Sequence, residues 1–138
     1  MSEKKLVKIT DEKEKTLETT EETTDTEALI VNAENVDKIV ESGKGILKLK
    51  KEIEIDGKMT DSIYFDLSSL NGFQYRNIIR EVEKKNKTKL QGQPAGDIDV
   101  QMAVFSKAAD IPTAVLQSYL TMKEMALATT VTYAFLMA

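Results

Sequence analysis

Apolar and charged residues alternate along residues 46–55, ILKLKKEIEI. Positions 47, 49, 53 and 55 are apolar, whereas positions 48, 50, 52 and 54 are charged. This alternation is typical of a β-strand with one buried face. In MTDSIYFDL, residues 59–67, Met59, Ile63, Phe65 and Leu67 again occupy odd positions, after an Asp56-Gly57 dipeptide that favours a tight turn. The two segments are predicted to form a β-hairpin.

The same apolar positions predict the register of the hairpin. A two-residue loop would pair odd positions with even ones, and so would oppose an apolar face to a polar one. We therefore expect a three-residue loop, 56–58, or an equivalent bulge. The predicted cross-strand pairs are Ile55 with Met59, Leu49 with Phe65, and Leu47 with Leu67. Because two strands alone are marginally stable in water, the hairpin must pack on other elements.

Helical spacing replaces the alternation after residue 70. Asn71 is a predicted N-cap with Gln74 three residues later, and basic residues lie near the expected C-terminal end, where the helix dipole favours cations. The apolar positions of this amphipathic helix are Tyr75, Ile78, Ile79 and Val82. The segment QGQPAG, residues 91–96, ends the helical region before the next helix begins.

Three further helices are predicted beyond this breaker. Asp97 can cap the first of them, and Pro112 can open a short one over IPTAVLQSYL, residues 111–120. Thr121 and Glu124 have the spacing of a capping box for the last helix. The stripe expected to be buried on the first of the three consists of Ile98, Met102, Phe105 and Ala109.

The chain closes on MALATTVTYAFLMA, residues 125–138, which hold no charged side chain. A helix that is apolar around its circumference lies either within a core or against another chain. The segment is shorter than the roughly 20 residues that span a bilayer, so no membrane anchor is expected. Methionines suit a surface that adapts to a partner. The candidate partner-binding residues are Tyr119, Leu120, Met125, Val131, Phe135 and Leu136; burial among the other helices is the alternative.

The N-terminal part of the chain differs in composition. Residues 10–27, TDEKEKTLETTEETTDTE, are mostly Thr and Glu and cannot bury enough apolar surface to offset the entropy lost on ordering. We predict a disordered acidic extension over residues 1–44, with a short helix at 33–41, and a domain over residues 45–138. The extension is either a solvated spacer or a tail that folds on a partner. The predicted fold class is α+β: a β-hairpin packed on a bundle of three to four helices.

Charge and composition narrow the function classes. Residues 1–45 hold 7 Lys against 12 Asp and Glu, whereas residues 46–138 hold 12 basic against 11 acidic residues. The domain is thus nearly neutral, and Glu81 and Glu83 lie beside the basic cluster Lys84 to Lys89, so nucleic-acid binding is not expected. Without Cys or His, the chain lacks thiolates and the commonest general base and metal ligand. No enzyme activity, cofactor or metal is predicted, and the absence of a secretory signal indicates the cytoplasm.

From residue 45 onward the chain resembles the Mu-type tail assembly protein family of tailed bacteriophages. The resemblance lies in the hairpin ILKLKKEIEIDGKMTDSIYFDL, the helix entry DLSSLNGFQ, and the segments VFSKAADIP, LQSYLTMKEM and YAFL. It implies a tail assembly chaperone that binds the tape measure protein in the host bacterial cytoplasm and helps recruit tail tube subunits. The extension of residues 1–44 departs from the family pattern.

Two other functions are compatible with the same residues. The first is a structural component of a phage or phage-like tail, whose hairpin edge pairs with a neighbouring subunit and whose last helix is ordinary core. The second is a small regulatory binding protein. A homo-oligomer is compatible with each of these functions.

Overall fold

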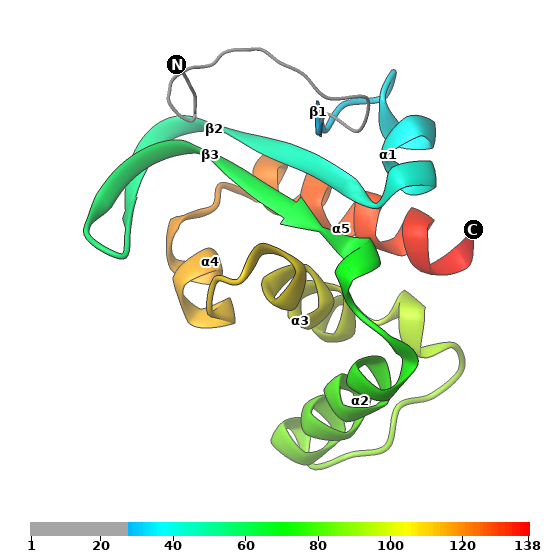
Figure 1. Ribbon diagram of the computed structural model, residues 1–138. Helices are drawn as coiled ribbons and strands as arrows, with labels where there is room; N and C mark the ends of the chain where they lie inside the picture. Colours follow the sequence, from blue (N-terminus) through cyan, green and yellow to red (C-terminus); the bar gives the residue numbers. More distant parts are fainter. Residues whose placement is uncertain (1–27) are drawn as a thin grey trace.

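The computed structural model describes residues 28–138, and these form an α+β unit, as the sequence predicts (Figure 1). The predicted extension, as far as residue 27, lies outside the described residues. In chain order the elements are β1 (Leu29–Ile30), α1 (Val36–Ser42), β2 (Lys44–Ile55), β3 (Lys58–Asp66), the 3₁₀ turn η1 (Leu67–Ser69), α2 (Gly72–Asn86), the 3₁₀ turn η2 (Pro94–Gly96), α3 (Ile98–Ala109), α4 (Thr113–Tyr119) and α5 (Met122–Met137).

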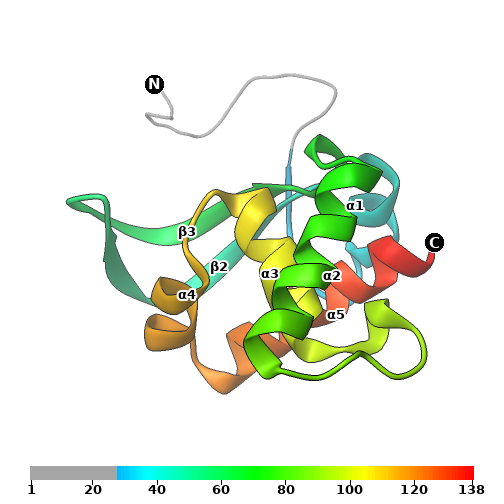
Figure 2. The same ribbon diagram turned by 90° about the horizontal axis from the view of Figure 1, so that it is seen from below.

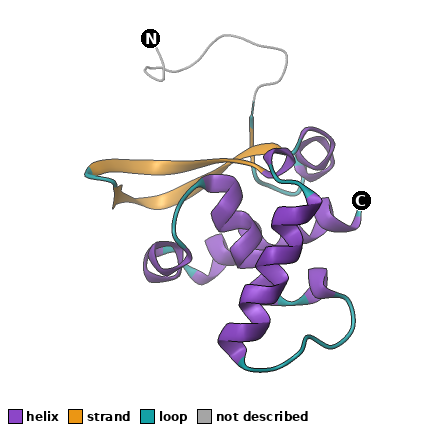
Figure 3. Ribbon diagram, turned by 60° about the horizontal axis from the view of Figure 1, so that its bottom comes forward, coloured by secondary structure: helices purple, strands orange, loops and turns teal. Residues whose placement is uncertain are grey.

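The strands form one sheet in the order β1-β2-β3, in which β1 is parallel and β3 antiparallel to β2. Helices α3 and α5 lie on one side of this sheet (Figure 1). Helix α2 packs on the side of α3 that faces away from the sheet (Figure 2). The tip of the β2–β3 hairpin extends beyond the helices (Figure 3). The core lies between the inner face of the sheet and the two helices α3 and α5.

Two aromatic rings mark the centre of this core. Phe65 of β3 and Phe105 of α3 are fully buried, and their ring centroids are 4.9 Å apart. Gly45 lies directly across from Phe65 in the β2–β3 ladder, so the aromatic ring occupies the space that a side chain on β2 would need. The sheet therefore depends on a residue without a side chain at position 45.

The observed hairpin turn corrects the predicted register. Asp56 and Gly57 both have positive φ, 53° and 79°, and form a two-residue turn that pairs Ile55 with Lys58. The predicted three-residue loop and its three cross-strand pairs are wrong, whereas the alternative expectation, a bulge, is confirmed. The register shifts inside the strands instead, where residues 49–52 of β2 face the single residue Asp61. This irregularity returns the apolar residues to one face, because Leu47 then pairs with Ile63.

The folded unit also begins earlier than the predicted boundary at residue 45. Val31 and Ile39 are buried in the core, and the Val31 N–H donates to the Ile46 carbonyl at 2.9 Å. The helix expected at residues 33–41 is α1, which ends at Gly43 with φ 81°. The composition of the segment before residue 45 did not predict that it belongs to the folded unit. Strand β1 is only two residues long, and its stability comes from pairing with β2.

The helix starts agree with the sequence. Asn71 with Gln74 and Thr121 with Glu124 form capping boxes, and Asp97 accepts hydrogen bonds at the start of α3. One predicted position is wrong: Ile98 is exposed, whereas Val100 and Val104 are buried beside Met102 and Phe105. Ile98 is the first residue of α3, and the buried face of the helix begins only at Val100.

We expect Gly45→Ala to lower the free energy of unfolding by about 1–3 kcal/mol, as overpacking of a core does. A Cβ at this position would lie 2.5 Å from the Phe65 ring, which is buried against Phe105 and has little room to move. Gly72→Ala is the matched control, because nothing lies within 4 Å of its Cβ position and its φ is not positive. Urea denaturation of both variants measures the difference, and equal stability would contradict the packing argument.

Candidate protein-binding surface

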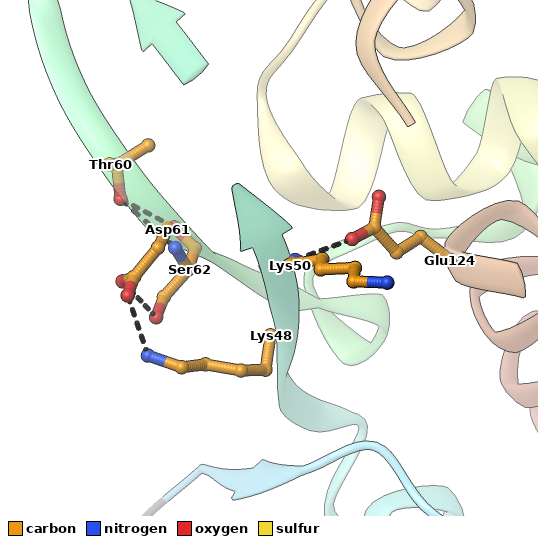
Figure 4. A network of polar contacts seen from close by, with 6 residues as sticks. All are labelled: Lys48, Lys50, Thr60, Asp61, Ser62 and Glu124. Carbon is orange, nitrogen blue, oxygen red and sulfur yellow. Dashed lines mark hydrogen bonds and ion pairs between the residues drawn. The ribbon is translucent and has the colours of Figure 1, made fainter. Parts of the chain in front are cut away.

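Helix α5 is fixed at its start by a buried carboxylate. Glu124 accepts the Thr121 N–H at 2.9 Å with Oε1. With Oε2 it accepts the Lys50 N–H at 2.7 Å (Figure 4). Lys50 lies in the irregular part of β2, where the strand has no partner residue in β3. One side chain therefore caps the helix and also binds a backbone group that the irregular ladder leaves unpaired.

These hydrogen bonds determine the charge state of Glu124. The side chain is only 7% exposed, and burial disfavours its charged form. The hydrogen bonds from Thr121 and from the Lys50 N–H, together with the Lys50 charge, outweigh this effect and lower the pKa of Glu124 below its usual value of 4.5. Glu124 is thus an ionised buried group whose charge stabilises the fold.

The buried side of α5 contains polar residues as well as apolar ones. Val131 and Ala128 are buried beside Thr129 and Thr132. The Thr132 hydroxyl donates to the Ala128 carbonyl at 2.8 Å, and the Thr129 hydroxyl donates to the Met125 carbonyl at 3.0 Å. Because these hydroxyls are satisfied within the helix, they can face α1, α3 and β2 without an unpaired polar group.

The opposite side of α5 is exposed; it includes Lys123 in the first turn and, beside it, an uncharged row of five residues. The residues of this row follow one another at intervals of four, four, three and four, which places them on one face of the helix. Met122 is 88% exposed, Tyr133 43% and Met137 48%. We call this surface the α5 stripe; it consists of Met122, Ala126, Thr130, Tyr133 and Met137. Because it carries no charge, a partner can cover it without desolvating an ion.

The residues predicted to bind a partner have different locations. Tyr119, the last residue of α4, is half-exposed, whereas Leu120 and Val131 belong to the buried core. Met125, Phe135 and Leu136 are partly buried and pack against that core. The structure therefore leaves Tyr119 well exposed and does not gather the six residues on one surface.

The sequence pattern did not predict the α5 stripe, because the residues expected to bind a partner were large and apolar. Ala126 and Thr130 lie in the middle of the stripe and carry no such signal. The helical spacing of Met122, Tyr133 and Met137 was visible, but the side that faces the core depends on how α5 is rotated. The contact between Glu124 and β2 sets that rotation.

Residues 28–138 also form a groove that the α5 stripe does not line. Within residues 28–138, no group of three or more His, Cys, Asp or Glu residues could hold a metal ion. A groove of about 220 Å³ lies between α2, α3 and α4, with Ile78, Val82 and Met102 among its apolar lining residues. The Asn86 side chain donates to Asp99 at 3.0 Å, and both residues line this groove. This arrangement offers no nucleophile activated by a neighbouring base.

Comparison of the chain with protein-family models, with curated proteins and with solved structures found no match. Among the helices of residues 28–138, none has the length and apolar character needed to cross a membrane.

We expect Glu124→Gln to lower the free energy of unfolding at neutral pH by about 1–3 kcal/mol, because glutamine cannot accept both N–H groups as a carboxylate does. The folded-state pKa of Glu124 is lowered, so its contribution is present above pH 4.5 and is lost as the pH falls through the folded-state pKa. Wild type and variant should therefore converge in acid. Chemical denaturation between neutral pH and about pH 3 measures this convergence.

Asp61→Asn is the control for Glu124→Gln, because it removes the charge of a carboxylate that lies in an exposed ion pair. Burial disfavours the charge of Asp61, but the Lys48 ammonium, 2.9 Å away, still lowers its pKa. Both side chains of this pair are about half exposed, so we expect a loss below about 1 kcal/mol. If Glu124→Gln were no more destabilising than Asp61→Asn, Glu124 would not be the main link between β2 and α5.

Proposed function

We propose that this protein is a non-enzymatic tail assembly chaperone of a tailed bacteriophage, which binds the tape measure protein in the host bacterial cytoplasm and helps recruit tail tube subunits. The proposal starts from the resemblance of residues 45–138 to the Mu-type tail assembly family. The observation that carries it is the α5 stripe, an uncharged surface on a helix whose other side is buried in the core. A chaperone needs such a surface to cover apolar segments of its client.

The shape and chemistry of the α5 stripe suit a helical client. With 16 residues, α5 is about 24 Å long, enough to lie along several turns of another helix. Ala126 and Thr130 are small and allow a partner helix to approach closely. The methionines at the two ends are flexible and can adapt to different side chains along a long client.

The edge of the sheet is less suited to assembly. The Leu67 N–H donates to the Gly43 carbonyl, so the alternation of antiparallel pairs directs the Ser62 backbone groups away from β2. The Thr60 hydroxyl donates to the Ser62 carbonyl at 2.9 Å and accepts the Ser62 N–H at 3.2 Å. With these groups occupied, β3 cannot pair with a further strand at Ser62, whereas the same alternation directs the Tyr64 backbone groups outwards.

We expect Ala126→Asp to abolish the increase in soluble tape measure protein that co-expression of the wild-type chain produces. The substitution places a charge in the centre of the α5 stripe, where binding would desolvate it. It is preferable to a change at Phe135, which packs against the core and would also lower stability. The measurement is the soluble fraction of the tape measure protein encoded beside this chain, with wild type, variant or neither.

Ala114→Asp is the matched control, because Ala114 is also an exposed alanine in a helix but lies in α4, outside the α5 stripe. Circular dichroism and thermal unfolding establish that both variants are folded. The proposal fails if folded Ala126→Asp solubilises the client as well as wild type does, or if the wild-type chain has no effect.

We further propose that the acidic extension keeps the coated complex soluble through like-charge repulsion. Residues 10–27 carry eight carboxylates against two lysines. Removing residues 2–27 leaves β1 and α1 intact and should lower the solubility of the complex without preventing its formation. Light scattering of the purified complexes at low salt measures this; unchanged solubility would assign the extension no such role.

A further inference from the structure

A row of basic side chains follows the exposed face of α2, opposite the side that packs on α3. Its members recur at intervals of four, four and three residues, which places them on one face of the helix. All of them are exposed, and the ion pair found among residues 28–138 joins Lys48 to Asp61, which are not part of this helix. We call this surface the basic stripe; it consists of Arg76, Arg80, Lys84 and Lys87.

Two glutamates of α2 lie to the sides of the basic stripe. Glu81 lines the groove between α2, α3 and α4. Glu83 is partly buried, and its Oε2 accepts the Leu90 N–H at 2.9 Å. Glu83 also borders a shallow depression at the C-terminal end of α2, whose other lining residues are Arg80, Lys84, Lys87, Thr88 and Lys89. The depression therefore holds one carboxylate among four cations.

Charge is unevenly distributed over the described chain. Residues 76–89 carry six basic and two acidic side chains, a net charge of +4. The remainder of residues 28–138 carries eight basic against twelve acidic side chains, a net charge of −4. An anionic partner is therefore attracted to α2 and repelled by the rest of the domain.

The same chain contains a segment of matching charge. Residues 18–27 carry five carboxylates and no basic residue, and we call them the acidic run. The eight residues before them, 10–17, hold three carboxylates and two lysines, so most of the negative charge lies next to residue 28. A second copy that presented its own basic stripe would be repelled, whereas one that presented its acidic run would be attracted.

The acidic run joins the described chain on the side of the molecule opposite α2. It leads into β1, and β1 and α2 lie at opposite ends of the view in Figure 1, with β3 and α3 between them. A domain of this size has a radius of gyration of about 13 Å, so a path over its surface to the opposite side is about 50 Å long. Ten extended residues reach only about 35 Å. The acidic run is therefore too short to lie along α2 of its own copy.

We propose that the acidic run of one copy binds the basic stripe of a second copy, so that the protein assembles head to tail. The two contact surfaces differ, and such heterologous contacts build chains or rings. The contact consists of exposed charges, so it is weak and sensitive to salt. It leaves the formal net charge of −4 on each copy unchanged, so assemblies still repel one another. The basic stripe is separate from the α5 stripe, and the inference does not depend on the chaperone proposal.

Sedimentation velocity of the full-length protein tests the association. In about 0.01 M salt, where the Debye length is about 30 Å, we expect the weight-average sedimentation coefficient to rise with protein concentration. In about 1 M salt, where the Debye length is about 3 Å, it should keep the value of the monomer at every concentration. The salt dependence follows from the exposed position of the charges.

Two variants separate the two contact surfaces. Removal of residues 2–27 deletes the acidic run and keeps the basic stripe, whereas Arg80→Glu with Lys84→Glu keeps the acidic run and brings the net charge of residues 76–89 from +4 to zero. Each variant alone should remain monomeric in low salt. Their equimolar mixture should form a one-to-one complex that does not grow at higher concentration, because no second pair of surfaces is left.

The control pair Lys107→Glu with Lys123→Glu makes the same charge change at exposed positions of α3 and α5, and it should associate as wild type does. Circular dichroism establishes that every variant is folded. The proposal is overturned if wild type stays monomeric in low salt, if the protein without residues 2–27 still self-associates, or if the mixture of the two variants forms no complex.

A monomeric wild type that binds a single-stranded DNA oligonucleotide, and loses it on Arg80→Glu with Lys84→Glu, would assign the basic stripe to nucleic acid instead. Client solubility plays no part in these measurements, so their result and that of the chaperone test can be told apart.

Discussion

The contact between Glu124 and the Lys50 N–H joins the two halves of the fold. It connects residues 74 apart in sequence and places the first turn of α5 against β2. Without it, the Lys50 N–H and the start of α5 would each need another partner or water. The rotation of α5 follows from this contact, and so does the choice of which residues are buried and which form the α5 stripe. A polar interaction thus positions the apolar surface on which the proposed function depends.

The hairpin makes that contact possible. Asp56-Gly57 favours a two-residue turn, yet the apolar positions of the two strands do not match such a turn if both strands are regular. The chain satisfies both requirements by inserting residues 49–52 opposite Asp61. The insertion frees the Lys50 N–H from the ladder, and Glu124 accepts it. The irregularity of β2 and the buried carboxylate are therefore two parts of one arrangement.

The sequence alone was sufficient to predict structural features that depend only on residues close together in the chain. The capping residues Asn71, Asp97 and Thr121 identify three helix starts, because a cap acts within one turn. Features that depend on distant contacts were missed. The two-residue strand β1 exists only beside β2, and Ile39 is buried by elements far along the chain. For the candidate surface, the sequence pattern did not predict which side of the last helix is exposed, since Val131 is buried and Tyr133 exposed.

The chemistry of the α5 stripe determines what kind of partner could cover it. The α5 stripe has no charge, so its affinity depends on apolar area and on close packing, and salt should affect it little.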